Sequence, residues 1–246
     1  MHDATEATVV GESVWSLVVN DEPYSVGTAS PGGEAALGAG RLIADGLIEK
    51  AADLLSIGAG VLHNGAVRIE AQIDPRRFAA SRELRQHQAA EGCGLFHFLR
   101  CAPRLLTRGR PVDVVAPGDV APMLQELFEA CRQTARGGGV HAAGLGTGGG
   151  LRNIIVDVAR HAAAEKAVGS AFLTDGLPLG GGLVVTSRIS GAMALLAARA
   201  GICWIASRSI PTTLAVDIAA VAGMTLVARA AGGGTRIIVP PTAMHE

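Results

Sequence analysis

The second half of the chain alternates between short apolar runs and longer amphipathic segments. The runs predict four strands, over 153–158, 182–186, 202–206 and 224–228. The segments between them predict three helices, over 160–168, 190–200 and 212–222. Strand–helix alternation at this spacing is typical of a largely parallel sheet with helices packed on its faces. We therefore predict the α/β class, with a mixed, largely parallel sheet flanked by helices.

The first half is patterned as an α+β part. Residues 13–30 predict two short strands around a polar turn, and alternation over 65–73 predicts another strand. Apolar positions from Glu34 to Leu55 follow a helical period, interrupted near Gly46. Residues 121–132 predict an amphipathic helix that leads into the second half.

The segment 76–112 is arginine-rich and irregular, which is typical of a functional loop rather than of core. We expect this segment to be a mobile loop at the end of an N-terminal part, 1–112. The α/β cofactor-binding core would follow over 113–246. The glycine-rich run 144–150 stands between predicted strands and not in a strand-to-helix turn. We therefore interpret that run as a hairpin and not as a dinucleotide-binding loop.

Cys93 lies in this arginine-rich segment, between two glycines that leave its thiol sterically open. Arg82, Arg85 and Arg100 are close in sequence and favour the thiolate, which is the nucleophilic form. The alternative is a free cysteine packed as a small hydrophobe. The local sequence does not decide between the two.

Two loops that follow predicted strands carry hydroxyls and an arginine ahead of a helix. They are Thr186–Ser190 and Ser207–Thr212. Ligands in α/β sheets bind beyond the carboxyl ends of strands, and helix N-termini favour anions. The pair therefore predicts a phosphate or pyrophosphate pocket, and the alternative is ordinary helix capping by Ser or Thr. The candidate residues are Ser187, Arg188, Ser209 and Thr212.

Arg160, His161 and Lys166 lie at the start and on one side of a predicted helix. Positive charge at a helix N-terminus is unfavourable unless an anion is bound there. The alternative is a solvated helix face with a structural histidine. His141 is either a ligand contact or a core histidine.

Composition narrows the range of partners and compartments. The net charge is −1, which gives no indication of nucleic-acid or anionic-membrane binding. No apolar run is long enough to span a bilayer, and no secretory signal is visible. The cysteines are scattered without metal-site spacing, so we expect reduced thiols in a cytoplasmic protein. Cys131 and Cys203 are expected to be structural, whereas Cys101 could be either structural or functional.

Several stretches, in this order along the chain, resemble the formate dehydrogenase accessory sulfurtransferases (FdhD type). They are 33–38, 45–48, 138–143, 157–169, 187–190, 210–219 and 222–227. The resemblance covers nearly the whole chain after about residue 12 and is strongest from residue 137 onward. Several motifs in one order are more specific than any single motif.

The resemblance implies a cytidine deaminase-like fold without zinc. It also implies a homodimer, since members of this family often form dimers. It implies that Cys93 takes sulfane sulfur from a cysteine desulfurase as a persulfide. That sulfur would pass to the molybdenum or tungsten of a transiently bound bis(molybdopterin guanine dinucleotide) cofactor, destined for formate dehydrogenase or a related enzyme. The implied cofactor contacts are Arg188, Ser209, Thr212, Arg229, Ala230, Ala231, Gly232, Gly233 and Gly234.

The chain departs from this family's pattern at the loop, where Phe96 replaces the second cysteine. Cys93 could still carry a persulfide but could not resolve it into a local disulfide. A degenerate, non-catalytic cofactor-binding chaperone is therefore the alternative function. A zinc deaminase is excluded, because His-x-Glu followed by Pro-Cys-x-x-Cys does not occur in the sequence.

Overall fold

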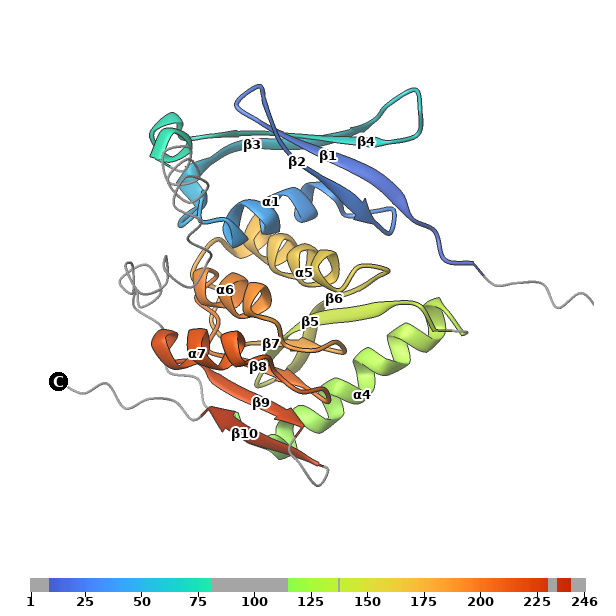
Figure 1. Cartoon of the computed structure of the whole chain (residues 1–246), viewed down its shortest axis with the longest axis vertical. Helices are drawn as coiled ribbons and strands as arrows, with labels where there is room; N and C mark the ends of the chain where they lie inside the picture. Colours follow the sequence, from blue (N-terminus) through green and yellow to red (C-terminus); the bar gives the residue numbers. More distant parts are fainter. Residues whose placement is uncertain (1–8, 81–114, 137, 230–233, 240–246) are drawn as a thin grey trace, which may run out of the picture.

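The computed structural model describes residues 9–80, 115–136, 138–229 and 234–239, which form two β-sheets with helices between and outside them (Figure 1). The smaller sheet contains β1 (Ser13–Val19), β2 (Glu22–Ala29), β3 (Leu54–Val61) and β4 (Val67–Ile73). Its strand order is β2-β1-β4-β3, with β1 parallel to β4 and the other pairs antiparallel. Buried and exposed residues alternate along β4, so one face of this sheet packs inward.

The larger sheet has the order β10-β9-β8-β7-β5-β6. Its strands are β5 (His141–Thr147), β6 (Gly150–Asp157), β7 (Gly182–Val185), β8 (Trp204–Ser207), β9 (Thr225–Arg229) and β10 (Thr235–Val239). The pairs β7–β8 and β8–β9 are parallel, and the remaining pairs are antiparallel. The predicted α/β class with a mixed sheet is confirmed. Within this larger sheet, parallel pairing is confined to β7, β8 and β9, the three strands joined by helical crossovers.

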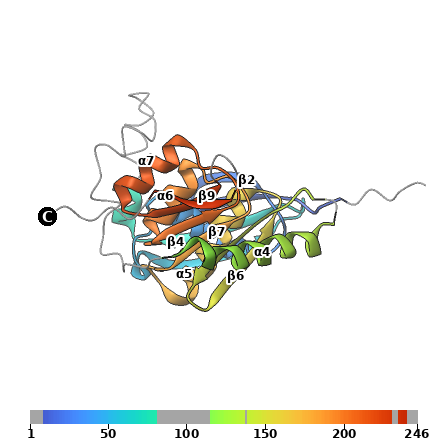
Figure 2. The ribbon, with the colours of Figure 1, turned by 90° about the horizontal axis from the view of Figure 1, so that it is seen from below.

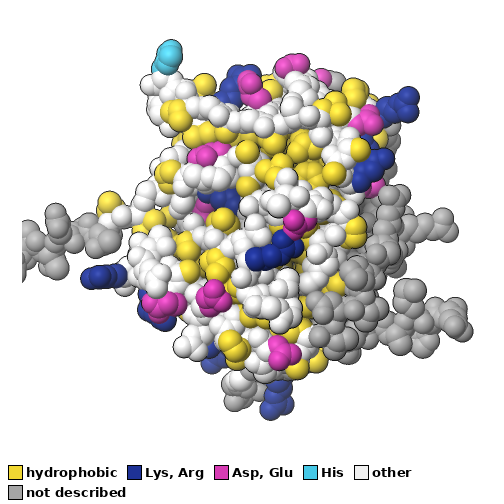
Figure 3. Space-filling view, turned by 180° about the vertical axis from the view of Figure 1, so that it is seen from behind, with side chains coloured by type: hydrophobic (Ala, Val, Ile, Leu, Met, Phe, Trp, Pro, Cys, Tyr) yellow, Lys and Arg dark blue, Asp and Glu magenta, His cyan; other side chains and the backbone are white. Residues whose placement is uncertain are grey.

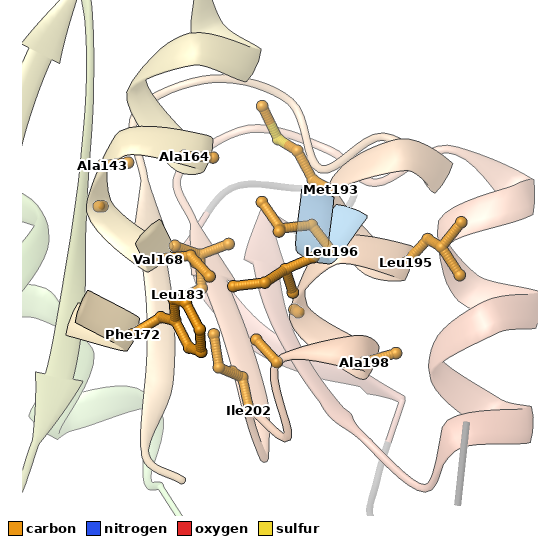
Figure 4. Packing of buried hydrophobic residues seen from close by; sticks show 14 of the residues in the cluster. Ala143, Ala164, Val168, Phe172, Leu183, Met193, Leu195, Leu196, Ala198 and Ile202 are labelled. Carbon is orange, nitrogen blue, oxygen red and sulfur yellow. The ribbon is translucent and has the colours of Figure 1, made fainter. Parts of the chain in front are cut away.

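Helices cover both faces of the larger sheet (Figure 2). The helices α5 (Arg160–Asp175), α6 (Gly191–Arg199) and α7 (Thr213–Ala222) lie on one face, and α4 (Pro117–Thr134) lies on the other. Side chains of β7 alternate between the two layers, because Leu183 and Val185 join the first and Val184 the second. Val168 and Phe172 of α5 lie beside Leu183 and Ile202 in the first layer (Figure 4).

The two sheets are joined through the crossing of α1 (Glu34–Ala44) and α5. A Cβ atom on Gly40 of α1 would lie 1.9 Å from the carbonyl oxygen of Glu165. A Cβ atom on Gly169 of α5 would lie 1.9 Å from the carbonyl oxygen of Ala36. Such distances exclude any side chain at these two positions, so the glycines allow the two helix backbones to come into contact. One cluster of buried apolar residues therefore extends across both sheets.

The helix predicted from Glu34 to Leu55 is wrong in its second half, since α1 ends at Ala44 and Leu54 begins β3. Gly46 adopts the left-handed conformation (φ 78°) and its N–H donates to Ile43, which ends the helix. The prediction also missed β3 and β10. The hairpin over 144–150 is confirmed by the pairing of β5 with β6.

The predicted loop 76–112 and the boundary at residue 112 fall mostly outside the described residues; residues 76–80 are helical. No helix in the described ranges is long and apolar enough to cross a membrane. The rear face carries basic, acidic and apolar side chains intermixed, without a large field of one sign (Figure 3).

Candidate functional site

One edge of the larger sheet collects most of the predicted site residues. His141 at the start of β5 pairs with Asp157 at the end of β6, and the parallel register aligns Val185 of β7 with Ser207 of β8. Because β9 runs parallel to β8, Arg229 at its end lies at the same edge. The loops after β7 and β8 therefore emerge side by side, as their sequences predicted.

Hydrogen bonds hold these loops together. The hydroxyl of Ser207 donates to the carbonyl oxygen of Ser187 (2.7 Å) and accepts from the backbone N–H of Ser209 (3.0 Å). The N–H of Thr212 donates to the carbonyl oxygen of Ile189 (2.9 Å). The N–H of Arg229 donates to the carbonyl oxygen of Ser209 (3.1 Å), so the end of β9 is tied to the same structure. Ser187 and Ser207 are buried and shape the loops from within.

The capping interpretation is confirmed for one hydroxyl in each loop. The Oγ of Ser190 accepts from the N–H of Met193 (3.4 Å), and the Oγ1 of Thr212 accepts from the N–H of Ala215 (3.3 Å). These bonds satisfy backbone donors in the first turns of α6 and α7. An anion at this edge would therefore depend on the arginines and histidines more than on these hydroxyls.

The exposed arginines at the edge come from different loops. Arg188 follows β7, Arg208 follows β8 and Arg229 ends β9, and all three are exposed. The guanidinium of Arg208 lies 5.5 Å from the ring centroid of Phe128 on α4, a cation–π distance. Arg208 was not among the residues predicted from the sequence, although it stands in the second of the two loops that carry hydroxyls and an arginine.

A second group of polar residues stands beside these loops, where β5 begins and α5 starts. His141, Arg160 and His161 are half-buried, and Nε2 of His161 lies 3.1 Å from Oγ of Ser190. Burial lowers the pKa of His141 and the positive charge of Arg160 lowers it further. The pKa of His161 is lowered by burial and then by Arg160, Arg41 and His141. Both rings are therefore predominantly neutral at neutral pH.

The Nε of Arg160 is buried and has no hydrogen-bond partner in the part of the chain that the structure describes. A buried donor without an acceptor is destabilising by about 1–3 kcal/mol. Together with the two neutral histidines, this donor makes the start of α5 suitable for an acceptor group such as a phosphate oxygen. The structure thus brings His141, Arg160 and His161 together with Arg188 at one edge.

Lys166 is separated from this group and lies in the interior. Its Nζ donates to Oδ2 of Asp157 (2.7 Å) and to the carbonyl oxygen of Ser30 (2.6 Å), and the residue is 2% exposed. The other oxygen of Asp157 accepts from the N–H groups of Ser30 (3.1 Å) and Ala159 (2.9 Å). Lys166 therefore joins the end of β6 to the end of β2 and does not face the loops.

The remaining candidates fall partly outside the described residues. Cys93, Cys101 and the stretch Ala230, Ala231, Gly232, Gly233 are among those not described, whereas Gly234 is exposed beside β10. Cys203 is buried and Cys131 is half-buried. Burial raises the pKa of the Cys131 thiol, which disfavours the thiolate and agrees with its predicted structural role.

Comparisons with known proteins extend over almost the whole chain. A crystal structure from Desulfotalea psychrophila, described as a formate dehydrogenase accessory protein, superposes with a TM-score of 0.69. It is 24% identical in sequence, and the match covers 94% of this chain and 87% of the other. At that identity the likeness establishes a shared fold.

Curated relatives are similar at a level that establishes the family. "Sulfur carrier protein FdhD" of Streptomyces avermitilis is 33% identical over 233 residues, covering 89% of this chain and 83% of the relative. The protein of the same name from Mycobacterium bovis is 30% identical over 237 residues, covering 90% and 86%. The model of the FdhD/NarQ family matches residues 10–244. The chain therefore belongs to the FdhD/NarQ family.

Proposed function

We propose that the chain is a sulfur carrier in the maturation of formate dehydrogenase, with Cys93 as the residue that carries the sulfur. The observation that supports this most directly is the match to the FdhD/NarQ family over 10–244, which includes the glycine-flanked Cys93. The relatives named above are sulfur carriers by name. Arg82, Arg85 and Arg100, close to Cys93 in sequence, would favour its thiolate.

The first step is a sulfane-sulfur transfer from a cysteine desulfurase. The Cys93 thiolate attacks the terminal sulfur of the desulfurase persulfide, and the desulfurase thiolate leaves. The Cys93 persulfide would then give its terminal sulfur to the metal of its substrate, a bis(molybdopterin guanine dinucleotide) in the reduced state. The metal would supply the two electrons that convert sulfane sulfur into a sulfido ligand, and the Cys93 thiolate would be the leaving group. In this role the chain acts as a sulfurtransferase, and the molybdenum cofactor is its substrate.

The polar edge of the larger sheet is the proposed place for the phosphates of that substrate. Arg188 and Arg229 would pair with phosphate oxygens in solvent, and the unpartnered Nε of Arg160 would donate to one from the interior. The stretch 230–233 continues this edge in sequence. The carrier cysteine would belong to the N-terminal part, 1–112, and the phosphate site to 113–246. A cytoplasmic homodimer is the assembly that we expect.

Phe96 favours a second candidate function, a chaperone that binds the cofactor without transferring sulfur. Phe96 stands where the family has a second cysteine, and the next cysteine along the chain is Cys101. Cys93 therefore has no second thiol close to it in sequence. The two candidates differ in whether Cys93 is required.

The test is maturation of formate dehydrogenase in cells that lack their own sulfur carrier. Formate oxidation should return with the unchanged chain, and it should stay absent with Cys93→Ser although that variant is soluble and folded. Cys131→Ser is the matched control and should restore activity. If Cys93→Ser restores formate oxidation to the level of Cys131→Ser, the sulfur-carrier proposal is wrong and the chaperone is supported.

A further inference from the structure

A cavity of about 390 Å³ lies between the smaller sheet and the helices α1, α5 and α6. Its wall on α6 is apolar and includes Met193, Leu195 and Leu196. Trp15 of β1 and Arg41 of α1 also line it. The volume falls within the range of about 300–1,000 Å³ that is usual for small-molecule sites, and an apolar wall with a few polar groups is the usual composition.

Trp15, which lines this cavity, has an indole N–H that is buried and unused as a hydrogen-bond donor. Trp15 is 7% exposed, and its Nε1 has no hydrogen-bond partner among the residues that the structure describes. Gly27 of β2 also lines the cavity, and a Cβ atom there would lie 2.7 Å from the indole ring and 3.3 Å from Nε1. Gly27 therefore leaves the space that the indole needs, and the buried donor is left without an acceptor, which is unfavourable until a ligand group or a small shift of the wall supplies one.

The charged groups at the cavity are arranged around Arg41. Its Nε donates to Oδ2 of Asp45 (2.9 Å), an oxygen that also accepts from the hydroxyl of Tyr24 (2.9 Å). Its Nη1 lies 3.5 Å from Oε1 of Glu165, which is almost fully buried on α5. Asp45 is thus engaged by two donors, whereas Glu165 has one longer contact with Arg41.

We propose that this cavity binds a small monocarboxylate with an apolar body. A carboxylate accepts hydrogen bonds and donates none, so it matches the N–H of Trp15, the guanidinium of Arg41 and a protonated Glu165. The side chains of α6 would contact the hydrocarbon part. An ammonium ligand would leave the Trp15 donor unused and would approach Arg41. This site needs neither Cys93 nor a desulfurase, although His161, which also stands at the proposed phosphate site, is among the residues that line it.

Proton uptake should accompany binding, since Glu165 repels an anion when it is ionised. Burial raises the pKa of Glu165 to about 7, and Arg41 lowers it. Asp45, which follows α1, and Asp157 at the end of β6 raise it further. His161, one turn earlier on α5, is predominantly neutral because its pKa is lowered. The affinity for a carboxylate should therefore fall about tenfold between pH 6 and pH 8.

The probe is 4-phenylbutyrate, titrated into the full-length protein labelled with ¹⁵N. The protein has two tryptophans, Trp15 and Trp204, which give two indole N–H signals, and Trp15→Phe assigns them. We expect the Trp15 signal to shift on binding and the Trp204 signal to stay unchanged. The affinity for the probe should be about tenfold weaker in Trp15→Phe, because one hydrogen bond to a charged group is lost. The amide and amine analogues of the probe are the controls and should bind more weakly than the acid.

Glu165→Gln provides a second test that keeps the size of the side chain. Its binding of 4-phenylbutyrate should be the same at pH 6 and pH 8, whereas Arg152→Met, at an exposed ion pair with Asp175, should keep the pH dependence. The proposal is overturned if the acid does not bind at millimolar concentration, if the amine binds as tightly as the acid, or if the Trp15 signal does not respond.

Discussion

At the scale of single residues, the ion pair of Lys166 with Asp157 is buried and is tied to the backbone. Both side chains are nearly inaccessible, at 3% and 0% of their side-chain surface, and both have further bonds to the backbone near Ser30. Such a pair adds little net stability relative to apolar residues, but removing one partner leaves a buried charge without compensation.

Lys166→Met should therefore lower the free energy of unfolding by about 3–5 kcal/mol, because Asp157 would stay buried without its counter-charge. Urea denaturation followed by circular dichroism measures the change. The control is Arg152→Met at the exposed pair with Asp175, for which the expected loss is at most about 1 kcal/mol. Equal losses in the two variants would contradict this account of Lys166.

Glu165 should make stability depend on pH in a defined window. Burial raises its pKa from 4.5 to about 7 in the folded state, so the folded protein binds a proton that the unfolded chain has released. Stability therefore declines as the pH rises from about 4.5 to 7 and levels off above that range.

Replacing Glu165 by Gln should remove this decline. Near pH 4.5, Glu165→Gln and the unchanged protein should be of similar stability. At pH 8 the variant should be more stable by roughly 3 kcal/mol, which corresponds to the difference between the ordinary pKa of 4.5 and the folded-state pKa of about 7. Urea unfolding at several pH values measures the difference. A difference that stays constant with pH would show that Glu165 titrates normally.

At the scale of elements, strands and helices were predictable where the period of apolar residues matches the structure that those residues form. The helices α5, α6 and α7 and the strands between them follow from periodicity. The length of α1 did not, because apolar residues continue the helical period beyond Gly46, and only the left-handed glycine ends the helix. β3 was missed because Leu54–Val61 contains two glycines and is paired at one edge of a sheet.

The candidate site was predictable to the extent that it depends on strand ends. The edge loops, with Arg188 and Ser209, followed from the rule for parallel strands. The inward position of Lys166 did not, because its partner Asp157 is on another element and Ser30 is 136 residues away in sequence. Trp15 and Arg41 were likewise not identified, since their cavity is formed where the smaller sheet packs against α1, α5 and α6.

The crossing of α1 with α5 gives a prediction at this scale. Gly40→Ala should lower the free energy of unfolding by about 3 kcal/mol. The new Cβ would clash with the backbone carbonyl of Glu165, which cannot move aside as a flexible side chain could. Gly118→Ala on α4 is the control, since a Cβ there meets no atom within 4 Å, and it should be neutral or slightly stabilising. Thermal unfolding compares the two, and a tolerated Gly40→Ala would contradict the close crossing.

At the scale of the whole molecule, one of the two core clusters spans both sheets, and two polar regions that share His161 lie beside it. One is the edge where β6, β7, β8 and β9 end, with neutral histidines and exposed arginines. The other is the cavity of Trp15 and Arg41. The edge is the proposed phosphate site for a cofactor, and the carrier cysteine belongs to the same chain, so sulfur would be received and delivered by one molecule.

The central claim is that Cys93 carries sulfane sulfur, and intact mass spectrometry tests it most directly. The protein is incubated with a cysteine desulfurase and cysteine, beside Cys93→Ser and Cys131→Ser, and a known acceptor shows that the desulfurase is active. We predict a gain of one sulfur atom in the unchanged protein and in Cys131→Ser, and none in Cys93→Ser. An unchanged mass of the parent protein, or an equal gain in Cys93→Ser, would contradict the account.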